Sequence, residues 1–418
     1  MLLFVHKKKT LSFSPFQDRR SPIPSLPPSS DLDPFAAEFR ADPFIHFAQL
    51  RALGPVVRLE RYNIWAVTRH QEAQHVLTDW QVFSNKGGGG LANFFKTPPW
   101  RQPSIILEVD PPEHDRARAI LIRVLSPAAV RKMRPQFERV ATELVDHAVE
   151  LGSFEAIEHL VQPFPLAVFP DEVGMAKQGR DHLLTYGAMV FGAFGPSTPW
   201  LEELMKRSEP AVTWITAHCQ REALAPDGLG AGIYAAADAG EITETEAGLL
   251  VRSLLSAGVD TTIDSIGLTL RCLAEHPDQW RLLREDPSLA RAAFEEATRY
   301  DASSQSLFRT TLREVELAGV TIGKHEKVLV FVGSAGRDSD RWEDPDRFDI
   351  LRRPAGHLGY GTGVHGCVAQ TLARLEGEVF FRTLAEKVTI LEPAGAAALR
   401  LNPGLRGLAQ LPLRLGAK

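Results

Sequence analysis

One cysteine near the carboxyl end of the chain lies in the segment that says most about chemistry. Cys367 follows a stretch rich in glycine, and the amphipathic pattern of a helix begins directly after it. Glycines let a backbone turn tightly and approach a flat ligand closely, and a helix N-terminus favours a thiolate over a thiol. A thiolate held in this way is a good axial ligand for haem iron. The simpler alternative is a buried structural cysteine after a flexible loop.

A second segment, near the middle of the chain, places an acid beside an alcohol. Asp260 and Thr261 follow the small pair Ala257-Gly258 inside an apolar run, 244–275, which predicts one long helix that crosses the core. Glycine and threonine are unfavourable in a helix interior, so their presence there needs a reason. An alcohol next to an acid can deliver protons to a reacting oxygen. The alternative is a packing notch whose hydroxyls bond back to helix carbonyls.

The rest of the chain predicts a mainly α fold with a minor β portion. Two alternating runs that meet at Tyr62-Asn63 predict a hairpin, and residues 336–357 lack periodicity and predict a coiled connection. No internal repeat or interdomain linker is visible, so a single large domain is expected over 34–418, after a lead-in, 1–33, that is expected to be disordered or loosely packed. Helices are expected over 69–79, 112–125, 127–151, 201–221 and 287–301, and strands within 314–333.

Composition narrows the class of protein. The 418 residues carry a formal net charge of −5, which argues against bulk attraction to nucleic acid. Cys219, Cys272 and Cys367 are far apart and form no paired motif, which argues against a disulfide framework or a zinc site and suits a reducing compartment. The first apolar run is too short for a signal peptide or an anchor, and no other run could span a membrane. We therefore expect a cytoplasmic protein.

The segment that ends at Cys367 resembles the haem-binding loop of the cytochrome P-450 superfamily, Phe-x-x-Gly-x-x-x-Cys-x-Gly. Tyr360 stands in place of the usual phenylalanine and keeps the aromatic ring, and Ala369 stands in place of the last glycine. The resemblance implies one large helical domain of that superfamily. It also implies haem b (iron protoporphyrin IX) as cofactor, Cys367 as the iron ligand, and monooxygenase chemistry with dioxygen.

Residues 257–262 resemble the oxygen-binding groove of the same superfamily, Ala/Gly-Gly-x-Asp/Glu-Thr-Thr. The resemblance implies that the small pair opens the helix over the haem. Thr261 would hydrogen-bond dioxygen and hold a water molecule, and Asp260 would relay protons. Glu296 and Arg299 match the superfamily's Glu-x-x-Arg, which locks the segment 345–348 and has a structural role. Their i, i+3 spacing alone would indicate an ordinary solvated ion pair.

Four more residues match the superfamily's anchors for the haem propionates, carboxylates that need charge-assisted partners when partly buried. His114 and Arg118 are spaced i, i+4 on one helix face, Arg309 lies just before a strand, and His365 lies two residues before the cysteine. Each of them alone would more often be an ordinary surface group. Because they follow the family's order together with the other motifs, all four are expected to bind haem.

Within the superfamily, the chain is most similar to bacterial monooxygenases of para-substituted benzoic acids, which demethylate 4-methoxybenzoate. The likeness lies in 100–112, 190–196 and 250–258. It implies a polar end that holds the substrate carboxylate, formed by Arg101, Ser104, Arg252, Ser253 and Ser256. It also implies apolar side chains that flank the aromatic ring, namely Leu107, Phe191 and Phe194. From periodicity alone, the serine and arginine residues would be helix-surface or loop groups.

Two positions depart from this branch close to the expected place of the para substituent. Ser304 and Leu307 stand where valine and phenylalanine are usual. The exchange predicts a wider pocket with an added hydroxyl, and so an altered preference, for a bulkier or more polar para or meta group.

No flavin or iron–sulfur motif is visible, so electrons must come from another protein. The resemblance implies a two-iron two-sulfur ferredoxin with an NADH-dependent ferredoxin reductase, docked on a basic face that includes Arg116, Arg123 and Arg374. Three alternatives remain open. A peroxide-using enzyme or an isomerase on the same fold would typically lose the acid–alcohol pair, and a non-enzymatic haem sensor would not need a proton relay. A hydroxylase of fatty or terpenoid acids could use Arg101 and Arg252 for another carboxylate.

Overall fold

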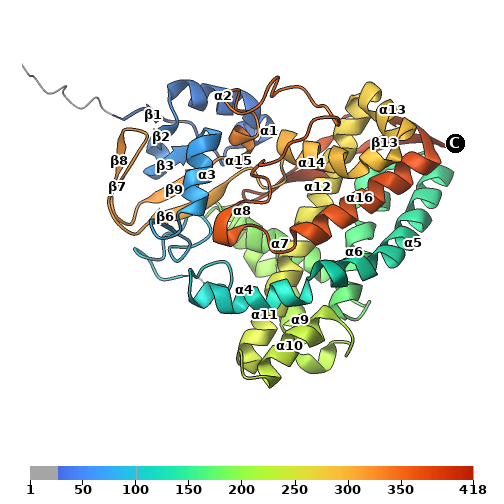
Figure 1. The fold of residues 1–418 in the computed structure, drawn as a ribbon, viewed down its shortest axis with the longest axis horizontal. Coiled ribbons are helices and arrows are strands. Elements are labelled where there is room, and N and C mark those ends of the chain that lie inside the picture. The colour runs from blue at the N-terminus through green and yellow to red at the C-terminus, as the bar shows by residue number, and fades with distance from the viewer. Residues whose placement is uncertain (1–26, 100, 418) are drawn as a thin grey trace, which may run out of the picture.

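The computed structural model of the chain describes residues 27–99 and 101–417 as one predominantly helical domain. Figure 1 shows the helices filling the right and lower parts of the molecule, and the main sheet at the upper left. The predicted class, mainly α with a minor β portion, is confirmed. The α-helices of the described residues are α1 (Ala37–Ala41), α2 (Pro43–Leu53), α3 (His70–Thr78), α4 (Glu113–Val124), α5 (Pro127–Leu151), α6 (Pro163–Val173), α7 (Asp181–Gly192), α8 (Pro199–Arg207), α9 (Glu209–His218), α10 (Leu229–Asp238), α11 (Glu244–Gly258), α12 (Asp260–Glu275), α13 (Pro277–Glu285), α14 (Ala290–Tyr300), α15 (Val332–Ala335) and α16 (Gln370–Lys387).

The β portion consists of one main sheet in the order β1-β2-β3-β9-β6-β4 and three small sheets, β10-β13-β5, β11-β12 and β7-β8. The predicted hairpin is confirmed: β2 and β3 pair antiparallel, and Asn63 makes the turn in the left-handed conformation that asparagine tolerates. The strands are β1 (Ser29–Ser30), β2 (Val56–Leu59), β3 (Ile64–Val67), β4 (Phe83–Ser84), β5 (Ser153–Glu155), β6 (Leu307–Thr311), β7 (Val315–Leu317), β8 (Val320–Ile322), β9 (Lys327–Val330), β10 (Val388–Pro393), β11 (Ala398–Leu401), β12 (Arg406–Gln410) and β13 (Pro412–Ala417).

Most of the expected lead-in, 1–33, lies outside the described residues. Within its last part, Ser29 and Ser30 form β1, which pairs in parallel with β2. The hydroxyl of Tyr62 donates to Asp33 at 2.9 Å, so this acid is also tied to the sheet. Residues before 34 therefore belong to the domain, because the exposed edge of β2 pairs with Ser29 and Ser30. In the described ranges, no helix combines the length and the apolar character needed to cross a bilayer.

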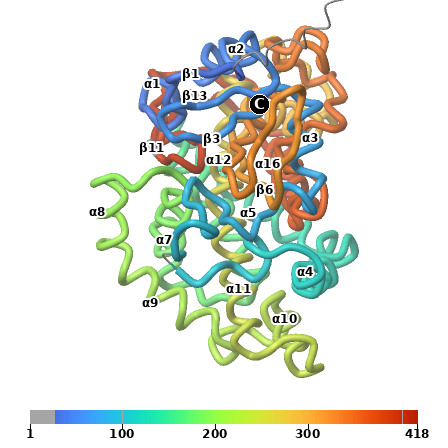
Figure 2. Tube along the Cα trace, turned by 90° about the vertical axis from the view of Figure 1, so that its left-hand side faces the viewer, coloured from blue at the N-terminus to red at the C-terminus, as the bar shows by residue number. Residues whose placement is uncertain are grey.

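The central helical run does cross the core, but it is two helices rather than one. α11 ends at Gly258 and α12 begins at Asp260, with Val259 between them, and Figure 2 shows the two following each other through the middle of the molecule. α12 packs against α7, α14, α16 and β12. Packing leaves no room for a side chain at Gly258, because an added β-carbon would lie 2.3 Å from the ring of Phe169 on α6. Another predicted helix, 201–221, is also divided, at Ser208 between α8 and α9.

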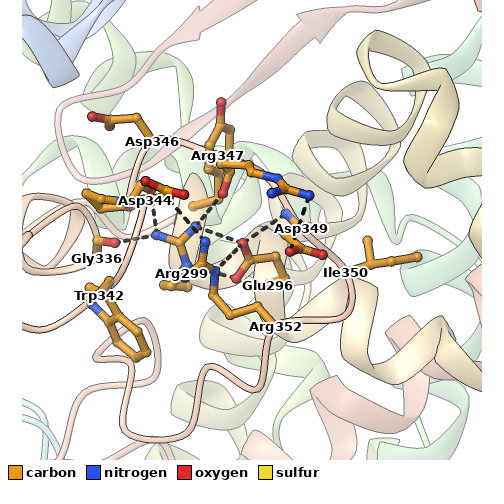
Figure 3. Close-up of polar contacts among 12 residues, drawn as sticks. Glu296, Arg299, Gly336, Trp342, Asp344, Asp346, Arg347, Asp349, Ile350 and Arg352 are labelled. Carbon is orange, nitrogen blue, oxygen red and sulfur yellow. Dashed lines mark hydrogen bonds and ion pairs between the residues drawn. The ribbon is translucent and has the colours of Figure 1, made fainter.

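The coiled connection after α15 is held in place by a buried ion cluster, which we call the meander cluster and which consists of Glu296, Arg299 and Arg352. Figure 3 shows how its side chains converge on this connection. Arg299 Nη2 lies 2.7 Å from Glu296 Oε1, and both side chains are 0% exposed. The remaining donors of the Arg299 guanidinium reach the carbonyl groups of Gly336, Pro345 and Arg347. The pair has the structural placement that was expected, and it is fully buried rather than solvated.

Candidate active site

The loop before α16 delivers Cys367 to the interior. Gly361 and Gly363 have φ values of +65° and +70°, which a residue with a side chain adopts only with strain, and an added β-carbon on Gly363 would lie 2.7 Å from the carbonyl oxygen of Leu77. The N–H of Cys367 donates to the Tyr360 carbonyl at 2.8 Å and closes the loop. The ring of Tyr360 lies 4.4 Å from the guanidinium carbon of Arg374, so this aromatic residue packs beneath a cation.

The helix N-terminus by itself does not turn Cys367 into a thiolate. Burial raises the pKa of the Cys367 thiol, and a bond from the N–H of Ala369 offsets only part of that effect. The guanidinium groups of Arg118 and Arg374 also act in the offsetting direction. The sequence argument counted the helix terminus and left out the cost of burying a charge. A metal ion removes this cost, because a coordinating thiol is deprotonated outright.

The expected propionate anchors lie together beside this loop. The rings of His114 and His365 are 4.5 Å apart between centroids, one from α4 and the other from the cysteine loop. His365 Nε2 lies 3.3 Å from Asp110 Oδ1, and burial lowers the pKa of both imidazoles. Arg309, on β6, is also buried, and burial lowers the pKa of its guanidinium to about 10. Two of their nitrogen atoms, His114 Nε2 and Arg309 Nε, are buried and have no hydrogen-bond partner in the described part of the chain.

The acid and the alcohol of the central segment point in different directions, since successive helix residues are turned by about 100°. Thr261 is half-buried, and its hydroxyl donates to the carbonyl of Ala257 at 2.6 Å. Thr262 does the same to Gly258 at 2.9 Å, so the hydroxyls bond the carbonyls at the helix break. Asp260 is 1% exposed and pairs with Arg400 at 3.1 Å. Burial raises the pKa of Asp260 to about 6.

The polar end predicted for the substrate is assembled in part. Arg101 binds Glu108 through two hydrogen bonds of 2.8 and 3.0 Å, and Glu108 also accepts from the N–H of Ser104 at 2.8 Å. Arg252, on α11, is half-buried and makes no hydrogen bond or ion pair with any residue that the structure describes. Arg252 and Arg101 both act on the phenol of Tyr186, where they oppose the raising of its pKa by burial. The two guanidinium groups are therefore both near one buried phenol.

The two predicted serines of α11 use their hydroxyl protons within the helix. Ser253 donates to the Leu249 carbonyl at 2.8 Å, and Ser256 donates to the Ser253 carbonyl at 3.2 Å. Each hydroxyl keeps its lone pairs, but it must rotate before it can donate to a carboxylate.

The predicted ring-flanking residues are close to one another. The rings of Phe191 and Phe194 lie 5.6 Å apart, edge to face. The loop that contains Gly90 packs on the backbone of Phe194, and Leu107 packs against Gly89 of the same loop. These contacts bring the three predicted residues into one region of the fold.

Ser304 and Leu307, the two positions that depart from the branch pattern, lie between α14 and β6. Ser304 is half-buried, and its neighbour Ser303 accepts a hydrogen bond from Ser265 of α12 at 3.0 Å. Leu307 begins β6 and lies near Gly361 of the cysteine loop. Leu307 therefore borders the cysteine loop, and the residue before Ser304 contacts α12.

Comparison with known proteins decides the family. A family model described as Cytochrome P450 matches residues 227–393. Cytochrome p450 CYP199A2 of Rhodopseudomonas palustris is 50% identical over 389 residues, which cover 93% of this chain and 94% of that protein. The chain belongs to the cytochrome P450 family. It is therefore a haem-dependent monooxygenase that needs dioxygen and electrons from a redox partner.

Solved P450 structures share the fold along nearly the whole chain. Cytochrome P450 CREJ in complex with (4-ethylphenyl) dihydrogen phosphate has a TM-score of 0.84 and 27% identity, covering 92% of this chain and 99% of that one. The myxobacterial cytochrome P450 CYP267B1 in complex with myristic acid has a TM-score of 0.80 and 29% identity, covering 91% of this chain and 98% of that one.

The residues present fit the haem b that P450 proteins bind. The buried Arg309 Nε–H, which has no partner in the described ranges, suits a partly buried carboxylate, and His114 Nε2 suits a second one when it carries a proton. The thiol of Cys367 faces the same region, since Arg118 on α4 acts on its charge. A flat ring system with one axial ligand and two carboxylates matches this donor set.

Sequence reasoning missed four polar residues of this P450 site. Asp110 holds His365, Glu108 holds Arg101, and Asp264 shares Arg400 with Asp260. Asp264 had a sequence signal, because it is a second acid one helical turn after Asp260 in an apolar helix. The side chains of Asp110 and Glu108 had only the segment 100–112 as a hint, and Arg400 had none, because it reaches the site from a distant hairpin.

Proposed function

We propose that this P450 hydroxylates or O-demethylates a para-substituted benzoic acid or a related aromatic carboxylate. The observation that carries the proposal is Arg252, a half-buried guanidinium without an ionic partner among the described residues. Such a group favours an anionic ligand, because a carboxylate leaving water needs a charge-assisted partner. The edge-to-face pair Phe191 and Phe194 supports an aromatic body for that ligand.

The dimensions agree with a short aromatic acid. Ser253 and Thr261 are eight residues apart, which would correspond to about 12 Å along one continuous helix axis, and the break at Val259 lies within this span. A benzoate bound by Arg252 and Ser253 would span much of that distance and present its para substituent near Thr261. CREJ, with its para-substituted phenyl phosphate, is a family member that binds a ligand of the same kind, an aromatic ring with an anionic group opposite the para substituent.

A fatty or terpenoid acid is the second candidate. CYP267B1 binds myristic acid on the same fold, so the family accommodates an aliphatic carboxylate. The same Arg252 would then bind the acid, and the pocket would have to accept a longer chain.

Haem, when bound through Cys367, supplies the activation of dioxygen with two electrons. His114, Arg118, Arg309 and His365 would hold its propionates, and Tyr360 would support the loop. Asp260 would release a proton, and Thr261 would pass it on through a water molecule that its hydroxyl holds. Arg252 and the aromatic pair would keep the substrate oriented and exclude water around it.

We also propose a two-iron two-sulfur ferredoxin with an NADH-dependent reductase as the electron source. The three arginines expected on the docking face each form an ion pair within the protein. Arg116 pairs with Glu246, Arg123 pairs with Glu241 at 2.9 Å, and Arg374 pairs with Glu295 at 2.7 Å. Arg116 and Arg123 remain 52% and 54% exposed, so they are the better candidates for contact with an acidic partner.

A spectral titration of the holoprotein tests the carboxylate site. We expect 4-methoxybenzoate to shift the haem spin state and its carboxamide to have no such effect at equal concentration. Arg252→Leu should weaken binding of the acid by about 10- to 100-fold, as expected for loss of a hydrogen bond to a charged group. Arg281→Leu, at an exposed position of α13, is the matched control. Equal response to acid and amide would contradict the proposal.

Two further variants test the cofactor ligand and the substrate preference. Cys367→Ser should abolish the red-shifted Soret band of the reduced protein with carbon monoxide. Ser304→Val should change the turnover of 4-methoxybenzoate relative to bulkier para-substituted acids, and an unchanged ratio would remove the assigned role of Ser304.

A further inference from the structure

The first turns of α12 carry two buried acids that share one base. Asp260 and Asp264 are spaced i, i+4 and are each 1% exposed. Arg400 of β11 reaches both: Nη1 lies 3.1 Å from Asp260 Oδ1, and Nη2 lies 2.6 Å from Asp264 Oδ2. We call Asp260 and Asp264, which share Arg400, the acid pair.

Only one oxygen of each carboxylate is bonded. Asp260 Oδ2 and Asp264 Oδ1 are buried and have no hydrogen-bond partner in the described part of the chain. Such oxygens are costly in an ionised carboxylate, whereas a protonated carboxyl group bears much less charge there.

Two other elements leave room for these two oxygens. An added β-carbon on Gly187 of α7 would lie 1.7 Å from Asp260 Oδ2, and one on Gly407 of β12 would lie 1.8 Å from Asp264 Oδ1. Figure 2 shows α7 and β11 beside α12, and α12 contacts both α7 and β12. The carboxyl groups are therefore seated by backbone on both sides, and each is held at one position.

The charges of this cluster do not balance if both acids ionise. Two carboxylates and one guanidinium would leave a net negative charge in the interior, which is strongly unfavourable. Arg400 and the two acids are the only charged groups that act on this pair in the described ranges. Burial raises the pKa of Asp260 to about 6 and that of Asp264 to about 7, in agreement with one retained proton.

Arg400 also connects the acid pair with solvent. Its side chain is 27% exposed and lines a cavity of about 430 Å³ between α1, α2 and the β11–β12 hairpin. Phe39 and Phe331 form apolar walls of this cavity, and polar side chains such as Arg40 and Arg406 line it together with Arg400. Water in this cavity can approach the guanidinium on one side while the two acids lie on the other.

We propose that Asp264 is a second acid of the proton path and that Arg400 is its positioning residue. Asp264 stores the one retained proton and supplies it to Asp260, which passes it toward the active site, and the guanidinium stabilises whichever carboxylate is ionised. The proposal rests on the proposed role of Asp260.

The sequence of transfers balances. The retained proton passes from Asp264 to the ionised Asp260, Asp260 passes it on toward Thr261, and a proton returns to Asp264 from water that enters from the cavity past the Arg400 guanidinium. Only O–H bonds form and break, and no electrons move. The net result is one proton carried from solvent to the active site.

Infrared spectroscopy of the resting holoprotein is the first test, because it needs no turnover. We expect carboxylic acid absorption at neutral pH that decreases as pH rises. Glu376, another buried acid, contributes to this absorption, so the Asp264 component is the part that is lost in Asp264→Asn but kept in Asp146→Asn, an exposed acid of α5. Absence of such a band in the unaltered protein between pH 5 and 8 (roughly the window around the usual titration range of such buried acids) would overturn the proposal even if the variants failed to fold.

Coupling of electron use to product formation is the second test. Asp264→Asn should reduce coupled turnover by about tenfold or more and raise the solvent deuterium isotope effect, with substrate binding unchanged. Arg400→Lys, which keeps one positive charge, should give a coupled turnover between those of the unaltered protein and Asp264→Asn. If Asp260→Asn impairs turnover and Asp264→Asn does not, the present proposal fails while the role of Asp260 stands. If Asp260→Asn also has no effect, the relay under the proposed function is wrong.

Discussion

The meander cluster on α14 and the acid pair on α12 both bury arginine with carboxylates, and they differ in charge balance and in satisfied bonds. In the meander cluster one carboxylate, Glu296, meets two guanidinium groups, and no side-chain atom of Glu296 or Arg299 is without a partner. In the acid pair two carboxylates share Arg400, and an oxygen of each has no partner among the described residues.

This difference separates a structural use of buried charge from a chemical one. A cluster with every donor and acceptor satisfied holds chain segments in place, because breaking any bond leaves a buried charge exposed to an apolar interior. A cluster with one acid too many retains a proton instead, because neutralising a carboxyl group is the lower-cost way to bury it. Perturbed acids of this kind are concentrated at functional sites.

Loss of the meander cluster should have the largest effect. Arg299→Ala leaves Glu296 with fewer partners and removes the donors to Gly336, Pro345 and Arg347. Breaking a buried pair in this way should lower the free energy of unfolding by about 3–5 kcal/mol. Urea unfolding of the holoprotein followed by circular dichroism measures it. A loss below about 1 kcal/mol, the range of surface pairs, would show that the cluster is not structural.

The acid pair should instead appear in the pH dependence of stability. The folded-state pKa of Asp264, about 7, lies above its ordinary value of 3.8, so the folded protein keeps a proton that the unfolded chain releases. Its contribution to stability is therefore complete below about pH 4 and is lost as pH rises through about 7. Relative to Asp264→Asn, the unaltered protein should lose on the order of 2–4 kcal/mol across this window.

Urea unfolding of both proteins at several pH values provides that comparison. Parallel curves for the unaltered protein and Asp264→Asn would contradict a retained proton. Glu376, a third buried acid, is present in both proteins, and burial raises the pKa of its carboxyl group to about 8, so it cancels from the difference.

A small substitution should disturb the acid pair without removing a charge. Gly187→Ala places a carbon where Asp260 Oδ2 lies, and overpacking of this kind costs about 1–3 kcal/mol. We also expect coupling to fall, because Asp260 must move away from Arg400. Gly267→Ala on α12 is the control, since the closest atom to its added carbon would be the end of the Ile157 side chain, at 3.2 Å, and no acid lies among its nearest neighbours. Product formed per electron supplied is the measurement, and equal values for both variants would contradict the seating of Asp260.

The smallest effect is expected at an exposed pair. Arg281 and Glu285 are spaced i, i+4 on α13 with side chains 67% and 66% exposed, and their closest atoms are 3.9 Å apart. Arg281→Ala should change the free energy of unfolding by about 0.5 kcal/mol or less, because solvent screens such pairs. A larger decrease in the free energy of unfolding, measured with urea, would contradict the difference between surface and buried pairs on which the comparison depends.

Local patterns predicted what depends on neighbouring residues. Turn chemistry and periodicity act over a few residues. They account for the hairpin at Tyr62-Asn63, for helix α4 and for the loop that contains Gly361 and Gly363. The break at Val259 was missed, because a glycine and two threonines inside an apolar run indicate an anomaly but not where the helix divides.

The electrostatic state of the site could not be derived in the same way. The sequence expectation of a thiolate at Cys367 considered the helix terminus, whereas burial, a property of the whole fold, raises the pKa of the thiol. Arg101 was expected to meet a substrate carboxylate, and the fold places Glu108 against its guanidinium. In both cases the deciding groups come from packing rather than from the motif.

The sequence by itself identified the family, and it predicted the iron ligand and the haem anchors, because these are motifs read along the chain. Only the tertiary structure decided which charges meet. Arg400 lies 136 residues from Asp264 in the chain, on a short hairpin without any motif, yet the two are in contact. Pairing of this kind depends on how β11 and α12 pack, and packing is set by the whole core rather than by any segment.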